Sequence, residues 1–380
     1  KAGDNIVFMG TGIGTQVKEV GIFSPQMKPA AALSTGTVGY IIGTVKDPKD
    51  IRTGDTITTK ANPATEPLPG FREIKPMVFS GLYPISTDEY EKVRAGLEKL
   101  QLNDSAFSWH AESSVALGFG FRCGFLGLLH MEIVQERLER EHDIELVTTA
   151  PSVAYRAHTR RGETVAVDSP AKMPPIGEIE RVEEPIMKVT IHVPNEHVGP
   201  VVALCEERRG IQLDIAYPTP DHVVIVYELP LAEVILDFYD RLKSVSRGYA
   251  SMDYELVGYR ADDLVKLDIL VNGEPLDALS VIVHRSAAYS QGRALASKLK
   301  ELVPRQQYEV AIQAALGTKV ISRVTVKAMR KDVTAKCYGG DITRKRKLLE
   351  KQREGKRRMK AVGNIEVPQE AFLAILKLGT

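Results

Sequence analysis

Hydrophobic positions in the first 70 residues come in short runs that are bounded by glycine or polar residues, at 17–20, 38–42 and 55–59. Runs of this kind are typical of short strands separated by turns. Residues 1–70 are therefore predicted to form a small β-barrel. The run from Gly10 to Gly14 imitates a phosphate-binding loop, but a second strand and not a helix is expected after it, so we interpret it as a hairpin turn.

Residues 71–156 show a different order, in which alternation with period two gives way twice to helical periodicity. The pattern predicts a strand, a helix, two strands, a helix and a strand, at 74–82, 86–100, 106–110, 114–121, 126–140 and 144–149. In the second helix Leu126, Leu129, Ile133, Val134 and Leu138 are expected to share one apolar face. The βαββαβ order is that of a ferredoxin-like domain.

The same order returns in residues 185–262. Strands are expected at 187–193, 211–217, 223–228 and 250–259, with helices at 196–209 and 231–242. Between the two units, residues 157–184 are polar and contain Pro170, Pro174 and Pro175. We interpret this stretch as a linker or an extended strand pair.

Residues 263–380 form the last predicted region. Strands at 265–271, 280–284, 308–314 and 322–328 and a helix at 286–302 precede a basic stretch and a short terminal helix. The predicted fold class is thus multidomain α+β. It comprises a small β-barrel (1–70), two ferredoxin-like βαββαβ domains (71–156 and 185–262) joined by a linker (157–184), and an α+β basic C-terminal domain (263–380).

The net charge of +1 conceals a strong asymmetry. Residues 319–360 hold 16 Lys or Arg against 4 Asp or Glu, a local charge of +12, so the remaining chain carries −11. A basic end on an acidic body favours a polyanion as partner, RNA above all, over a merely solvated tail or an anionic lipid surface. The candidate RNA contacts are Lys327, Arg330, Lys331, Lys336, Arg344, Lys345, Arg346, Lys347, Lys351, Arg353 and Arg357, with Tyr338 placed for base stacking beside two glycines.

Motifs for catalysis are missing from the sequence. It contains no GxxxxGK[ST] phosphate loop, no Asn-Lys-x-Asp, no HExxH and no GxSxG. The three cysteines form no CxxC pair, so neither a metal site nor a disulfide framework is expected. His130 is interpreted as a core or interface histidine and not a catalytic one, and Cys205 as a buried core residue. No signal peptide or membrane span is evident, and a reducing cytoplasm is the expected location.

Two longer motifs resemble a known family. The run Phe119–Ile133, GFRCGFLGLLHMEI after its first residue, is similar to the third-domain signature of translocase-type ribosomal GTPases. The run Arg330–Gln352, which includes KCYGGDITRKRK, resembles the C-terminal domain of the LepA-type translation factors, the elongation factor 4 family. The short stretch 157–184 leaves no room for the large domain that translocases insert at that place.

The resemblance implies a translation elongation factor that binds the 70S ribosome (16S and 23S rRNA and ribosomal proteins) and tRNA. It also implies remodelling of tRNA positions by back-translocation, driven by GTP hydrolysis with Mg²⁺ in an N-terminal G domain. That domain is expected to be absent here, so the chain itself is expected to be no enzyme, to hold no cofactor, and to be monomeric and cytoplasmic, with peripheral contact to the inner membrane. The alternative is an RNA- or anionic-membrane-binding module unrelated to ribosomal GTPases.

Overall fold

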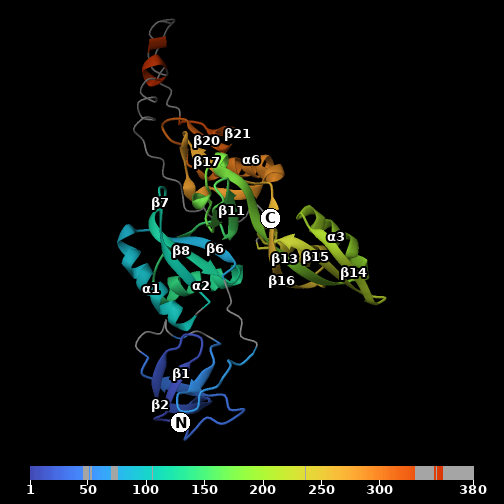
Figure 1. Cartoon of the computed structure of the whole chain (residues 1–380). Coiled ribbons are helices and arrows are strands. Elements are labelled where there is room, and N and C mark those ends of the chain that lie inside the picture. The colour runs from blue at the N-terminus through green and yellow to red at the C-terminus, as the bar shows by residue number, and fades with distance from the viewer. Residues whose placement is uncertain are drawn as a thin grey trace. The chain divides into compact units, whose positions relative to one another are not determined.

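The computed structural model of the chain describes residues 1–45, 51, 54–69, 76–104, 106–235, 237–329, 346, 347 and 349–353 (Figure 1). The chain divides into two compact units. One comprises residues 1–75 and 95–108, and the other comprises 76–94 and 109–380. Mixed helices and antiparallel sheets confirm the predicted α+β class.

The first unit contains a five-stranded antiparallel sheet. Its strands are β1 (Asn5–Phe8), β2 (Gly14–Ser24), β3 (Gln26–Pro29), β4 (Tyr40–Gly43) and β5 (Ile57–Thr59). They are ordered β3-β2-β1-β5, with β4 also paired to β2. The described strands do not close into the predicted barrel. The physical reason is a small core, because among the described residues of this unit the cluster consists of the buried Ile6, Val17 and Val20 with the partly buried Leu33, while β3 is exposed along its whole length.

The glycine-rich run at Gly10 is a hairpin turn, as predicted. Strands β1 and β2 pair with Val7 opposite Gly14, and the Gly12 amide donates to the Phe8 carbonyl at 2.7 Å. Gly12 has φ of +71°, a conformation that favours glycine. No helix follows the turn, so it cannot present a helix N-terminus to a phosphate.

Residues 78–148 form a ferredoxin-like fold, of which 95–108 are counted with the first unit and the rest with the second. Its elements are β6 (Val78–Pro84), η2 (Thr87–Glu89), α1 (Tyr90–Asn103), β7 (Ser108–Ser114), β8 (Gly118–Phe125), α2 (Leu128–His142) and β9 (Leu146–Thr148). The strand order β9-β6-β8-β7 is the order 4-1-3-2 expected of a βαββαβ unit. A two-residue strand, β10 (Ser152–Val153), pairs with the other end of β6.

Helix α2 buries only part of the face that its sequence suggested, since Val134 and Leu138 are buried as predicted. Met131 and Val134 are buried, whereas Leu129 is 70% exposed and Ile133 is 47% exposed. Both sets of residues recur at helical spacing, so periodicity alone could not decide between them. The prediction that Leu129 and Ile133 face the core was therefore wrong.

A second ferredoxin-like unit follows. Its elements are β13 (Ile179–Pro194), η5 (Asn195–His197), α3 (Val198–Glu207), β14 (Ile211–Thr219), β15 (His222–Pro230), α4 (Leu231–Val234), α5 (Phe238–Val245) and β16 (Ser251–Asp262). The order β14-β15-β13-β16 again has the first strand between the third and the fourth. Helices α3 and α5 contact each other, and Figure 1 shows α3 lying along one face of this sheet.

Residues 157–184 contain an extended strand pair. Strand β11 (Tyr155–Thr159) pairs with β12 (Thr164–Val167) and with the first half of β13. Two short 3₁₀ helices, η3 (Pro170–Lys172) and η4 (Ile176–Glu178), lead into β13. Of the two interpretations of residues 157–184, a linker or an extended strand pair, the structure shows the strand pair. The exact domain boundaries stay predictions.

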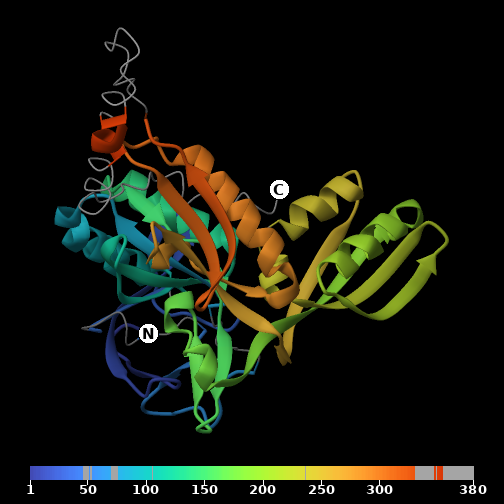
Figure 2. The same ribbon diagram turned by 90° about the horizontal axis from the view of Figure 1, so that it is seen from above.

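The C-terminal sheet lies against one long helix. Its elements are β17 (Leu264–Val271), β18 (Glu274–Pro275), η6 (Asp277–Leu279), β19 (Val281–His284), α6 (Arg285–Leu302), β20 (Val310–Leu316) and β21 (Lys319–Val326). Figure 2 shows α6 running along β20 and β21. Leu267, Ile269, Ala296 and Ile312 are fully buried between helix and sheet.

Candidate nucleic-acid interface

The basic segment leaves the C-terminal sheet through its edge strand. Strand β21 pairs with β20 from Val310 opposite Val326 to Leu316 opposite Lys319, and Val324 and Val326 pack into the core. Lys327, the first predicted RNA contact, is exposed directly after the strand. The Met329 amide donates to the Gln306 carbonyl at 2.8 Å, which fixes the point from which the segment departs.

The predicted contacts that the structure describes are exposed cations. Arg346, Lys347, Lys351 and Arg353 are exposed in helical turns at 346–347 and 349–353. Arg346 Nε lies 3.4 Å from Glu350 Oε1, and both side chains are more than half exposed. Arg330, Lys331, Lys336, Tyr338, Arg344, Lys345 and Arg357 lie outside the described residues.

Exposure decides what these side chains can do. An ion pair as exposed as Arg346–Glu350 is weak, because water and salt screen it. A phosphate can therefore compete for Arg346 at small cost. Side chains of Lys347 and Lys351 reach solvent as well, so the described part of the segment is suited to neutralising phosphates and not to chemistry that needs a dry site.

The scaffold under the segment is closely packed. Helix α6 buries Ala288, Gly292 and Leu295. A Cβ at Gly292 would lie 3.0 Å from the Ala314 Cβ, a tighter contact than most, so any larger residue would require the helix or β20 to shift by a few tenths of an ångström. At the start of the helix, His284 Nδ1 accepts from the Ser286 amide at 3.3 Å and caps it.

A cluster of ion pairs lies where the second ferredoxin-like unit meets the C-terminal sheet. Arg209 donates to Glu184 at 2.6 and 3.0 Å, to Asp262 at 2.9 Å and to Glu233 at 3.1 Å. Burial raises the pKa of Glu184 in spite of Arg209. Although burial opposes the charge of Arg209, its hydrogen bonds with Glu184 raise the pKa of the guanidinium.

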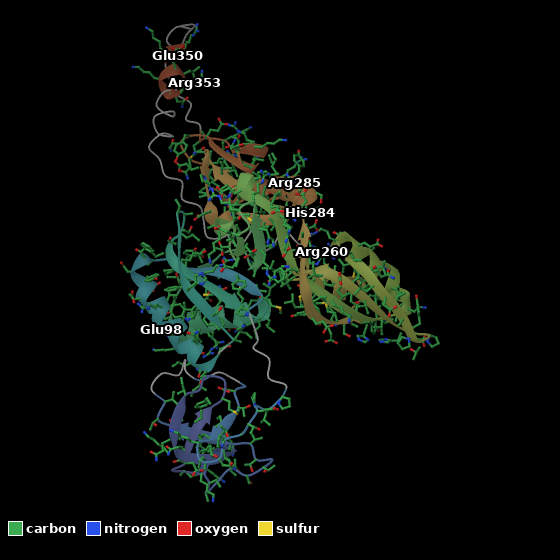
Figure 3. All side chains as sticks on the ribbon, viewed as in Figure 1. Glu98, Arg260, His284, Arg285, Glu350 and Arg353 are labelled. Atoms are coloured by element: carbon green, nitrogen blue, oxygen red, sulfur yellow. The ribbon has the colours of Figure 1, made fainter. Side chains whose placement is uncertain are left out.

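Asp262 and its neighbour connect this cluster to helix α6. His284 Nε2 lies 3.3 Å from Asp262 Oδ1, and Arg285 donates to Asp263 at 2.7 Å. Figure 3 shows His284 and Arg285 at the start of α6, where β16 passes into β17. Each of these cations has an acidic partner, so the cluster is organised to hold two elements together.

A cavity of about 320 Å³ lies beside this cluster and is lined by apolar residues such as Leu264 and Leu295 as well as by Arg208 and Arg241. Arg208 donates twice to Asp237 at 2.7 Å, and Arg241 donates to Glu207 at 2.8 and 2.9 Å. Its arginines are therefore already occupied by carboxylates. Among the residues that the structure describes, no three His, Cys, Asp or Glu side chains are grouped to hold a metal ion.

The Phe119–Ile133 motif has a structural role that sequence reasoning missed. Arg122 is only 3% exposed and donates to the Ser152 hydroxyl at 2.6 Å and to the Asp168 carbonyl. Burial lowers the pKa of this guanidinium. His130 accepts from the Leu126 amide at 3.0 Å, so it fixes the turn that enters α2. Cys205 is buried, and burial raises the pKa of its thiol to about 12, in agreement with a core role.

Within the described parts of the chain, no helix is both long enough and apolar enough to cross a membrane.

Comparison with known proteins matches two regions to protein families and the whole chain to part of a longer relative. Residues 271–377 match the family described as GTP-binding protein LepA C-terminus, and residues 181–270 match elongation factor G C-terminus. Over 378 residues the chain is 62% identical to elongation factor 4 of Sorangium cellulosum (strain So ce56). The match covers 100% of this chain but only 63% of that relative.

Proposed function

Since the chain is homologous to elongation factor 4 along its whole length, we propose that it is the ribosome- and RNA-binding portion of a translation elongation factor. The ferredoxin-like units dock on the ribosome, and the C-terminal domain contacts tRNA and 23S rRNA through the basic segment. GTP binding and hydrolysis belong to a G domain outside these 380 residues. The step acted on is the movement of tRNAs, in the direction of back-translocation.

The observation that carries the proposal is the basic segment in its structural setting. It begins at exposed Lys327, after an anchored edge strand, inside the region that matches the LepA C-terminus. From Lys327 to Lys360 it holds 14 Lys or Arg against 4 Asp or Glu, and this local charge of +10 exceeds what solubility of a small domain needs. Cations that are exposed and weakly paired bind phosphates with release of counterions.

The proposal is tested by sedimentation of the chain with 70S ribosomes across a salt series. The Lys347→Glu, Lys351→Glu variant reverses two exposed charges of the segment. If both side chains contact phosphate, the slope of log affinity against log salt falls by about 1.4–1.8. A matched control is Lys28→Glu, Lys298→Glu, because both of its cations are exposed and lie outside the ferredoxin-like units and the basic segment. Equal slopes for the two variants would refute the proposal.

The runner-up partner is an anionic membrane surface, since a polybasic segment also suits acidic lipids. The same two variants and the unchanged chain are sedimented with liposomes rich in phosphatidylserine. We expect binding to ribosomes to dominate at physiological salt. Binding to liposomes that is stronger than binding to ribosomes, and that is lost in Lys347→Glu, Lys351→Glu alone, would instead favour the membrane.

A further inference from the structure

Helix α6 carries an exposed polar stripe that the basic segment does not include. Successive residues of an α-helix are rotated by about 100°, so Tyr289, Arg293 and Lys300 fall within about 40° of one another. Ser286, Ser290 and Ser297 lie directly beside them on the same side. All six side chains are exposed, and Tyr289 exposes 58% of its surface. We call this set the α6 stripe.

The α6 stripe differs from an ordinary solvated helix face in its lack of acids. No Asp or Glu stands three or four residues from Arg293 or Lys300. The exposed face of α2 shows the usual arrangement, in which Arg137 pairs with Glu141 and Arg140 pairs with Glu136 at 2.8 Å or less. The one acid of α6, Glu301, lies 3.5 Å from Lys298. Lys298 is about 160° around the helix from Lys300.

The residue types of the α6 stripe match one class of ligand. Arginine and lysine neutralise phosphates, a serine hydroxyl such as that of Ser297 donates to phosphate and ribose oxygens, and an exposed tyrosine ring offers a surface on which an unpaired base stacks. The hydroxyls of Ser286 and Ser290 are already bonded to His284 Nδ1 and to the Ala287 carbonyl, so the cations and the ring are the main contacts. From Ser286 to Lys300 the stripe is about 21 Å long, which is long enough to follow several nucleotides of backbone. An acidic protein surface would use the cations but would leave the exposed Tyr289 ring without a purpose.

We propose that the α6 stripe is a second RNA-binding surface, which grips the sugar–phosphate backbone with Arg293 and Lys300 and stacks an unpaired base on Tyr289. This inference rests on the proposed function in one respect, namely that RNA is the partner of the C-terminal region. It adds a rigid contact to the basic segment. Gly292 and Leu295 seat the helix on its sheet, so the stripe is ordered before RNA arrives.

The test uses the full chain and a fluorescently labelled RNA hairpin with an unpaired 3′ end, titrated between about 50 and 200 mM salt. In the Arg293→Glu, Lys300→Glu variant, the loss of two phosphate contacts lowers the salt slope by about 1.4–1.8. The fall in affinity across that salt range then becomes about 7- to 12-fold smaller than for the unchanged chain. The control is again Lys28→Glu, Lys298→Glu, which makes the same change in net charge away from the stripe.

Stacking is measured separately. Tyr289→Ala is expected to weaken binding of this RNA roughly tenfold, whereas Tyr289→Phe retains the ring and the affinity. A blunt-ended RNA duplex of two strands, which has no unpaired nucleotides, should show no difference between these two variants. If Tyr289→Ala and Tyr289→Phe bind the 3′-tailed RNA equally well, the assignment of a base to Tyr289 is wrong.

The outcomes separate this inference from the proposed function. If Arg293→Glu, Lys300→Glu matches the control while Lys347→Glu, Lys351→Glu loses affinity, the α6 stripe is not an RNA surface and the proposed function stands. If both variants match the control, both proposals fail. Far-UV circular dichroism shows whether α6 is intact in the charge-reversal variant. If the helix is disturbed, Arg293→Gln, Lys300→Gln takes its place, and the same fall in the salt slope is expected.

Discussion

The Arg209 cluster gives the most quantitative prediction. Glu184 is fully buried, and Arg209, itself 20% exposed, is its partner at 2.6 Å. Removal of one member of a buried pair leaves a charge without compensation and typically costs about 3–5 kcal/mol. We expect Arg209→Ala to lower the free energy of opening of strand β13 by that amount. Arg209 has φ of +58°, in the left-handed region. Alanine disfavours this region as arginine does, so the substitution leaves the backbone strain unchanged.

The destabilisation by Arg209→Ala should arise from the unpaired charge of Glu184 and not from the lost packing of the Arg209 side chain. Glu184→Gln in the Arg209→Ala background removes the buried charge, and we expect it to recover at least about 1 kcal/mol. The pKa of Glu184 is already raised by burial, and loss of Arg209 raises it further. A carboxyl whose pKa is raised in the folded state contributes stability that is present below the pKa of the unfolded state and is lost as pH rises through the pKa of the folded state. The loss of stability in Arg209→Ala should therefore be smaller at about pH 5 than at about pH 8.

Hydrogen exchange followed by mass spectrometry of peptides measures the free energy of opening of strand β13. Peptides from β13 and β16 should exchange faster in Arg209→Ala, and the double variant should restore part of their protection. Trp109, the single tryptophan, packs edge-to-face on Phe121 in the other ferredoxin-like unit, so its fluorescence reports whether that unit is undisturbed. A change in the opening free energy of β13 below about 1 kcal/mol, or no recovery with Glu184→Gln, would refute the reasoning.

Three further predictions concern the scaffold. Gly292→Ala should destabilise the C-terminal sheet by about 1–3 kcal/mol, because its Cβ meets the Ala314 Cβ at 3.0 Å; thermal melting checks this. Asp277 accepts from the Val115 amide at 2.9 Å, so Asp277→Ala should expose the β7–β8 turn and speed its hydrogen exchange, whereas Asp277→Asn, which keeps one acceptor, should have a smaller effect. Cys205 should react with a thiol reagent only on unfolding, because it is buried and its thiol pKa is raised to about 12; mass spectrometry after brief labelling checks this.

Periodicity and turn residues were sufficient to predict most elements of the second unit. The helix expected at 286–302 is α6 at Arg285–Leu302, and the strand expected at 265–271 is β17 at Leu264–Val271. Both ferredoxin-like strand orders follow from the βαββαβ sequence of elements. These features are local, since each depends on residues within one turn or one strand, and that is the range in which sequence patterns are informative.

Features that depend on distant partners were missed. Strand β13 begins at Ile179, although Glu180, Arg181, Glu183 and Glu184 make its first half read as polar. It is a strand because β11 and β16 pair with its two edges. Nor does the sequence show that Glu184 is buried, since its partner Arg209 stands 25 positions away. A buried charge is recognised only when the pair that compensates it is seen.

At the candidate site, too, the sequence predicts one part, while the other part depends on the fold. Charge density located the basic segment without any knowledge of the fold, because electrostatic attraction to a polyanion depends on net charge more than on exact geometry. The α6 stripe needed the structure. Its two cations are diluted among alanines and serines in the sequence, and only the helical rotation and the burial of Gly292 and Leu295 show that Tyr289, Arg293 and Lys300 face solvent together. A diffuse charged segment and an ordered stripe in one domain would divide the work of binding, with the first adding affinity that falls with salt and the second fixing the orientation of the RNA.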